Sequence, residues 1–203
     1  MALLIVSPAH RVAEPVARRN PSHVISLESP TPETADPAFE NHRCFSFNDI
    51  TEPRPGLVAP SAEMIDALLD FDKGWDGAHP LLIHCWAGIS RSCAAAFVLA
   101  CDRNPGRERM IADELRRRAP FATANRLMMR LADDLLARDG RMVAAIEAIG
   151  RGAEAPHGEP FDLPVRYWSS QRNAVQPRPQ RRHSTRASAA STTRCTGPSP
   201  KRA

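Results

Sequence analysis

The chain has 203 residues, of which 42% are apolar, and its formal net charge is +4. Residues 1–168 carry 19 basic and 23 acidic side chains, whereas residues 169–203 carry eight basic side chains and no acidic one. The length suits one globular domain. No apolar stretch approaches the roughly 18 residues that span a membrane, and none has the pattern of a signal peptide. These absences exclude membrane and secreted classes and predict a cytoplasmic protein.

The first half of the chain predicts strands that alternate with helical segments. LLIVS at 3–7, HVISL at 23–27 and HRCFSF at 42–47 read as strands. Between the first two strands, residues 9–20 have a helical pattern that Pro15 interrupts. After the third strand comes a polar loop, NDITEPRPG, at 48–56.

The alternation continues to Cys101. A helix is predicted over 61–75, with Ser61 as its N-cap and Gly74 near its end. PLLIHC at 80–85 is the most apolar strand, which is typical of the centre of a parallel sheet, and SCAAAFVLAC at 92–101 predicts a buried helix. This order indicates an α/β fold, with a central, mostly parallel sheet of about four to five strands flanked by helices.

The C-terminal half of this domain is predicted to be helical. Residues 107–118 and 123–150 have apolar side chains at i, i+4 spacing, including Met110, Leu115 and Met142, and such stripes form the core far more often than a cofactor site. The domain is predicted to cover 1–168.

Residues 169–203 predict a disordered basic tail rich in Arg, Ser and Pro, because they lack aromatic and nearly all large apolar side chains. A solvated appendage is the favoured interpretation, and weak anion binding by the tail is the alternative. Nucleic-acid binding is not expected of the domain.

The stretch LLIHCWAGISRS at 81–92 carries the chemistry. A strand that runs into a short loop and a helix aims backbone N–H groups and a helix N-terminus at one point, where an oxyanion such as phosphate can bind. Cys85 lies at that point, Gly88 permits an unusual backbone geometry, and the planar guanidinium of Arg91 can clasp two oxygens. The positive field favours a nucleophilic thiolate at Cys85 over the alternative of a small buried thiol at a strand end. Cys101 has the same spacing to Arg107 but follows a helix, so we expect it to pack in the core.

HCWAGISRS resembles the signature H-C-x5-R-S/T of the cysteine-based protein tyrosine phosphatases, and residues 1–165 are most similar to small dual-specificity and bacterial tyrosine phosphatase-like proteins. The resemblance implies that Cys85 attacks phosphorus to form a phosphocysteine, that Arg91 binds phosphoryl oxygens, and that Ser92 stabilises the leaving thiolate. It implies that His84 orders the loop and tunes the thiol. The expected phosphate-binding residues are Trp86, Ala87, Gly88, Ile89, Ser90 and Arg91. The Trp86 and Ile89 side chains either line the pocket and influence substrate choice or simply pack.

The resemblance also implies a general acid in a loop that precedes the cysteine. Asp49 in FNDITEP follows a predicted strand and is the candidate, with Glu52 of the same loop as the reserve. A lone aspartate in a polar loop is otherwise a turn residue. Asn125 resembles an asparagine that braces the phosphate loop in this family, and a helix N-cap is an equally good interpretation.

The five cysteines, Cys44, Cys85, Cys93, Cys101 and Cys195, have no disulfide or metal spacing, so we expect reduced thiols, no metal and no cofactor. The predicted partner is a phosphorylated protein or a small phosphomonoester. The alternatives are hydrolysis of phosphoinositides, nucleotides or other non-protein phosphates, arsenate reduction, and a pseudophosphatase that binds phosphate without turnover.

Overall fold

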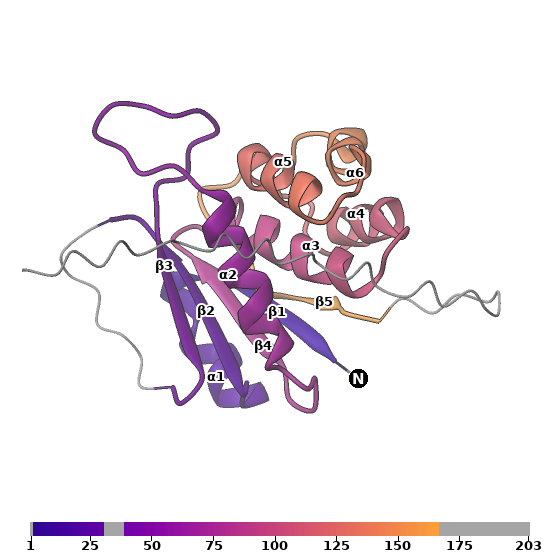
Figure 1. The fold of residues 1–203 in the computed structure, drawn as a ribbon. Coiled ribbons are helices and arrows are strands. Elements are labelled where there is room, and N and C mark those ends of the chain that lie inside the picture. The colour runs from indigo at the N-terminus through magenta and orange to yellow at the C-terminus, as the bar shows by residue number, and fades with distance from the viewer. Residues whose placement is uncertain (1, 31–38, 167–203) are drawn as a thin grey trace, which may run out of the picture. The chain divides into compact units, whose positions relative to one another are not determined.

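A five-stranded sheet forms the centre of the computed structural model, which describes residues 2–30 and 39–166 (Figure 1). The strands are β1 (Leu3–Pro8), β2 (His23–Glu28), β3 (His42–Ser46), β4 (Leu81–Cys85) and β5 (Phe161–Pro164). They lie in the order β3-β2-β4-β1-β5, and all pairs are parallel except β1 with β5. The predicted α/β class is confirmed, and β4 lies in the middle of the sheet, as its apolar sequence indicates.

Helices cover both faces of this sheet (Figure 1). One face is covered by α1 (Ala13–Arg19), which follows the short 3-10 helix η1 (Ala9–Arg11). Here Val12, the N-cap of α1, and Val16, within it, pack against the strand residues Ile5, Val24 and Leu82. On the other face the larger core contains the helices α2 (Ala62–Lys73), α3 (Arg91–Arg103), α4 (Glu108–Arg118), α5 (Arg126–Leu135) and α6 (Arg141–Ile149). Successive residues of a strand therefore pack into different cores, one under α1 and the other under α2–α6.

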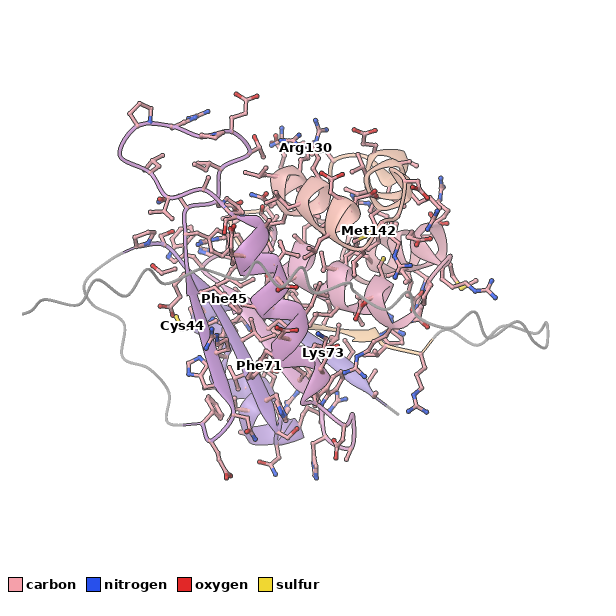
Figure 2. All side chains as sticks on the ribbon, in the orientation of Figure 1. Cys44, Phe45, Phe71, Lys73, Arg130 and Met142 are labelled. Atoms are coloured by element: carbon pink, nitrogen blue, oxygen red, sulfur yellow. The ribbon has the colours of Figure 1, made fainter. Side chains whose placement is uncertain are left out.

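The edge strand β3 illustrates this alternation. Phe45 is 7% exposed and belongs to the core under α2–α6, whereas its neighbour Cys44 is exposed (Figure 2). Side chains of a strand point alternately to its two faces, so a one-residue shift in register would bury the wrong set.

Helix ends follow the predicted chemistry at two positions. The Ser61 hydroxyl accepts a hydrogen bond from the Met64 amide and caps α2, and Gly74 ends that helix. Pro15 lies in the first turn of α1, where its missing N–H is not needed. The helical pattern over residues 9–20 therefore forms a short helix that begins just before the proline.

The stretch 123–150, which is predicted to be helical, contains two helices, α5 and α6. The turn between them has positive φ at Ala137, Asp139 and Gly140. The Asp-Gly pair marks this turn, but the apolar period continues across it and conceals the break.

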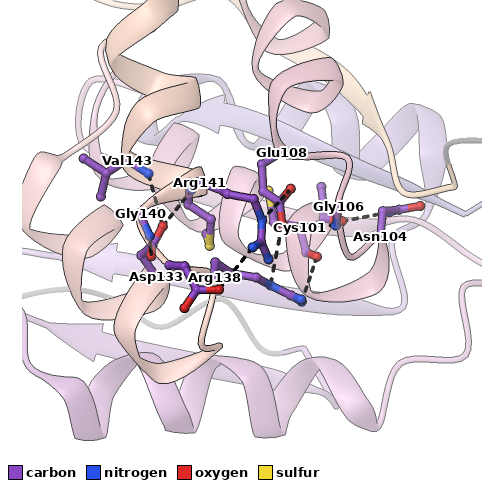
Figure 3. Close-up of polar contacts among 12 residues, drawn as sticks. Cys101, Asn104, Gly106, Glu108, Asp133, Arg138, Gly140, Arg141 and Val143 are labelled. Atoms are coloured by element: carbon purple, nitrogen blue, oxygen red, sulfur yellow. Dashed lines mark hydrogen bonds and ion pairs between the residues drawn. The ribbon is translucent and has the colours of Figure 1, made fainter. Parts of the chain in front are cut away.

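A buried carboxylate holds this turn together (Figure 3). Asp133, 3% exposed, accepts hydrogen bonds from the amides of Gly140 (2.6 Å), Met142 (2.7 Å) and Val143 (3.3 Å). Gly140 is the N-cap of α6 and has no side chain, so the Asp133 carboxylate satisfies the free amides instead. Nearby, Arg138 lies 3.7 Å from the buried Glu108 carboxylate, which ties the turn to the start of α4.

The prediction that Met110 is a core residue is wrong, because its side chain is 44% exposed. The buried face of α4 is formed by Glu108, Ile111, Ala112 and Leu115. Met110 lies one position away from that face, which is about 100° around the helix.

The predicted tail and the domain boundary at residue 168 lie outside the described residues. Within the described ranges, no helix has both the length and the apolar character that crossing a membrane requires.

Candidate active site

The loop that joins β4 to α3, residues 86–90 (the β4–α3 loop), lies at the carboxyl edge of the parallel strands. Cys85 is the last residue of β4 and is 2% exposed, and Arg91 is the first residue of α3. The topology therefore places the thiol at the start of the loop and the guanidinium at its end.

Carbonyl groups of the β4–α3 loop are hydrogen-bonded away from its centre. Three donors come from distant segments: the pairs are Ala9 N with Trp86 O (3.3 Å), Gly158 N with Ala87 O (2.8 Å) and Thr123 N with Ile89 O (3.0 Å). The fourth pair, Cys93 Sγ with Gly88 O (3.4 Å), is formed by the first turn of α3. No backbone acceptor is found within the described residues for the amides of Ala87, Ile89 and Ser90. Amides left free in one short loop form an anion-binding concavity.

Gly88 is required in this loop for two reasons. Its φ is +72°, in the left-handed region, and a Cβ at this position would lie 2.6 Å from the backbone nitrogen of Pro8. A side chain would therefore both strain the backbone and separate the loop from β1.

The thiol of Cys85 has two polar neighbours. Its Sγ lies 3.1 Å from the Ser92 hydroxyl and 3.3 Å from the Gly88 amide nitrogen, which donates to it. Both contacts can donate to a negatively charged sulfur, and Ser92 is fully buried.

Arg91 is anchored from one side only. Its Nη1 donates to the carbonyl of Phe47 (2.9 Å) and to the Ser29 hydroxyl (3.3 Å), and its guanidinium carbon lies 5.7 Å from the centre of the Phe47 ring. Its Nε is buried and has no hydrogen-bond partner among the described residues. A buried donor without a partner is costly, and an anion in the loop would satisfy it.

His84 lies on the same face of β4 as Leu82, which is the face covered by α1. Its Nε2 lies 2.6 Å from the Ser26 hydroxyl, and the ring is 5% exposed. Burial lowers the pKa of His84 from 6.5 to about 4, so the ring is neutral at neutral pH.

Asp49 lies at the rim of the β4–α3 loop. Its Oδ1 accepts hydrogen bonds from the Ser90 hydroxyl (2.8 Å) and from the Asn125 side-chain amide (2.7 Å). At the neck of its loop the Asn48 amide donates to the Val58 carbonyl. Glu52 is exposed and makes no hydrogen bond to another described residue, so the geometry favours Asp49 of the two carboxylates.

Asn125 has one of the two roles considered for it, the helix N-cap, and braces the Asp49 loop in place of the phosphate loop. Its Oδ1 caps α5 by accepting from the amides of Leu127 and Met128, while its Nδ2 donates to Asp49 and to the Ile50 carbonyl. It thus braces the Asp49 loop, and within the described residues it has no hydrogen bond to the β4–α3 loop. Arg130, one turn further along α5, donates to the Thr51 carbonyl and also holds this segment (Figure 2).

Two pockets open beside the β4–α3 loop. One, of about 540 Å³, is lined by Ile89, Ser90, Phe121, Thr123 and residues 151–156. The other, of about 400 Å³, includes Asp49, Asn125, Arg126, Glu147 and Arg151. They share Ser90, Thr123 and Arg151, so a bound group can extend from the loop into both.

On another side of the loop, Trp86 is 68% exposed. Its ring centre lies 5.1 Å from that of His157, which in turn lies 4.8 Å from that of His10. Trp86 therefore projects from the loop into an aromatic group, whereas Ile89 lines a pocket.

The other described cysteines differ from Cys85. All four of the described cysteines are thiols rather than disulfides. Burial raises the pKa values of Cys93 and Cys101 well above the usual range of a thiol, so both stay protonated. That state does not suit the thiolate relay that arsenate reduction needs. The described residues contain no group of three or more His, Cys, Asp or Glu placed to hold a metal ion.

Some site residues were not identified from sequence. Thr123 and Gly158 donate to the β4–α3 loop from segments that carry no motif, and Ser26 and Ser29 lie in and just after a strand that reads as ordinary core. Of these residues, only Gly158 has a signal in the sequence, which is the glycine itself. A Cβ at this position would lie 2.9 Å from the Gly88 carbonyl oxygen, so the close approach requires a residue without a side chain.

No protein-family model and no curated protein matches the chain significantly. Among solved structures, the chain is similar to DUSP15, with 16% identity and a TM-score of 0.51 over 73% of this chain and 92% of that one. It is also similar to Tk-PTP in the active form, with 21% identity and a TM-score of 0.49 over 66% of this chain and 90% of that one. The likeness to DUSP15 shows that the chain has a fold similar to that of this protein.

Proposed function

We propose that this chain is a cysteine-dependent phosphomonoester hydrolase that removes phosphate from tyrosine, or from tyrosine and serine or threonine, in proteins. One observation carries the proposal: the thiol of Cys85, free loop amides and the partnerless Nε of Arg91 surround one short loop. A nucleophile and an oxyanion holder are thus combined, as phosphoryl transfer through a covalent intermediate requires.

The reaction proceeds in two displacements. The Cys85 thiolate attacks phosphorus, the bond to the leaving oxygen breaks, and Asp49 gives that oxygen its proton. Asp49 then removes a proton from water, the water oxygen attacks the phosphocysteine, and the S–P bond breaks. The Ser92 hydroxyl, 3.1 Å from Sγ, stabilises the departing thiolate, while Arg91 and the loop amides hold the phosphoryl oxygens in both steps.

The charges beside the loop favour a protein substrate over a phosphoinositide. The pockets contain Arg126 and Arg151, but also the carboxylates of Glu147 and Glu154. Basic and acidic groups balance there, whereas a headgroup with several phosphates is best bound by a basic cluster.

The test is hydrolysis of p-nitrophenyl phosphate and of phosphotyrosine peptides by the purified chain in the presence of a metal chelator. Cys85→Ser is expected to abolish turnover in a folded protein, because serine has no comparable fraction of the anionic nucleophile. Cys44→Ser, which removes an exposed thiol of the sheet, is the matched control and is expected to be fully active.

Cys85→Ser activity within about tenfold of the wild-type rate would rule out the nucleophile. A wild-type protein that retains phosphopeptide but releases no phosphate would instead be a binding module. Faster metal-free hydrolysis of phosphoinositides than of phosphopeptides would contradict the proposed substrate class alone.

A further inference from the structure

The hydroxyl of Ser26 connects two histidines beneath the β4–α3 loop. Ser26 Oγ lies 2.6 Å from His84 Nε2 and 2.7 Å from His42 Nε2. Ser26 is 1% exposed in β2, between the strands β4 and β3 that carry the two rings, and the parallel register pairs it with His84. A buried ring adjacent in sequence to Cys85 is thereby linked to a half-buried ring at the start of β3.

This hydroxyl has one proton to donate. Ser26 Oγ has no hydrogen-bond partner among the described residues besides the two rings, so this proton finds an acceptor only if Ser26 donates to one ring and accepts from the other. A neutral imidazole carries its proton on one nitrogen, and the hydrogen bond at the other nitrogen determines which. When both rings are neutral and one of them accepts the Ser26 proton, they carry their own protons on opposite nitrogens: Nδ1 in His84 with Nε2 in His42, or the reverse.

Among the described residues, Ser26 is the one hydrogen-bond partner of the His84 ring. The Nδ1 atom of His84 is buried and has no hydrogen-bond partner among the described residues. Because Nδ1 is bonded to Cγ, it is the ring nitrogen nearer to the main chain of β4, in which Cys85 is the next residue. A proton on Nδ1 directs the positive end of an N–H dipole to that side, whereas a bare Nδ1 directs a lone pair there.

The arrangement in which Ser26 donates to His84 is compatible with more protonation states of His42 than the arrangement in which Ser26 accepts from His84. A protonated His42 has no lone pair to accept from Ser26, so it permits only the arrangement in which Ser26 donates to His84. A neutral His42 permits both. Glu28 on β2 also acts on His84, and its negative charge favours protonated groups near it.

We propose that Ser26 and His42 are positioning residues that hold His84 as its Nδ1–H tautomer and so favour the thiolate of Cys85. The inference rests on the nucleophilic role proposed for Cys85. Neither residue touches the reacting atoms, and both act through the ring of His84.

The direct test uses the unmodified full chain labelled with ¹⁵N in its histidines. Imidazole nitrogen shifts are expected to place the proton of His84 on Nδ1 and that of His42 on Nε2. A proton on Nε2 of His84 in the wild-type protein would overturn the proposal.

The second test measures how fast iodoacetamide alkylates Cys85 at neutral pH, followed by mass spectrometry of the peptide. Ser26→Ala and His42→Leu are expected to slow alkylation by about tenfold, because less of the thiol is ionised. Ser26→Thr keeps the hydroxyl, and His42→Gln keeps an N–H donor, so each is expected to restore most of the rate. The control is Ser22→Ala, which removes a contact of 3.0 Å between Ser22 Oγ and His23 Nδ1 at the far end of β2.

A folded Ser26→Ala protein that is alkylated at the wild-type rate would contradict the proposed positioning role of Ser26. Turnover of p-nitrophenyl phosphate is recorded in parallel, which separates the two proposals. The expected alkylation rates without any turnover would support the positioning role of Ser26 and His42 and would contradict the proposed phosphatase activity.

Discussion

Asp49 is the residue whose replacement best separates acid catalysis from phosphate binding. Asp49→Asn keeps an oxygen for the donors Ser90 and Asn125 but has no proton to give, so turnover of phosphotyrosine peptides should fall by roughly 10² to 10⁴. The loss should be smaller for p-nitrophenyl phosphate, whose leaving group departs without a proton. Steady-state kinetics on both substrates measure this difference, and vanadate inhibition should persist.

Glu52→Gln is the matched control for Asp49→Asn. Glu52 belongs to the same loop but is exposed and makes no hydrogen bond to other described residues, so its replacement should leave the rates unchanged. If Asp49→Asn were fully active and Glu52→Gln impaired, the general acid would be Glu52.

His84 is expected to make the fold sensitive to acid. Its pKa is 6.5 in the unfolded chain and about 4 in the fold, so the unfolded state binds more protons between these values and stability falls as pH falls from about 6.5 to about 4. The full difference corresponds to about 3 kcal/mol of unfolding free energy. Urea denaturation at pH 7 and pH 4 should show a loss larger by this amount in the wild type than in His84→Asn. Equal losses in both proteins would mean that the ring is protonated in the fold.

At this scale, the sequence predicts the residues that lie within one short stretch. Cys85, Gly88, Arg91 and Ser92 occupy a strand, a loop and a helix start whose chemistry is local. Thr123 and the other buttressing residues escape detection because their contribution is a backbone amide brought from elsewhere, and any residue except proline supplies one.

Among the elements, α6 depends on a residue outside it. Asp133→Ala removes the acceptor of three buried or partly buried hydrogen bonds from amides at the α5–α6 turn and should lower the unfolding free energy by about 2 kcal/mol. Chemical denaturation measures the change. Asp134→Ala, at the exposed neighbouring position, should stay within about 0.5 kcal/mol of the wild type. A similar loss in both variants would contradict this capping role.

Four of the five strands and the long helices were predictable because they show clear periodic or continuous apolar patterns. The fifth strand, β5, is only four residues long, FDLP, and ends in proline, so it carries no strand pattern of its own. It forms because β1 offers an edge to which Phe161–Pro164 pair in antiparallel register. The α5–α6 break was missed since the apolar spacing is continuous across it.

For the whole molecule, every residue proposed to act in catalysis lies within the described residues. A chain cut after Trp168 is therefore expected to hydrolyse p-nitrophenyl phosphate at the full-length rate while having a lower isoelectric point, because it loses eight basic side chains and no acidic one. Activity and isoelectric focusing measure the two properties. Loss of folded protein would show that the domain boundary lies further along the chain.

The buttressing of the β4–α3 loop has a consequence for the growing polypeptide. Its outward carbonyls bond to amides of Ala9, Thr123 and Gly158, so the loop is completed by segments made at the beginning and near the end of translation of the domain. While the ribosome has released only the sheet strands β1–β4 and α3, the cysteine is already synthesised but its cradle is incomplete. The nascent chain thus carries the Cys85 thiol before the amides of Thr123 and Gly158, which complete the loop, have been synthesised.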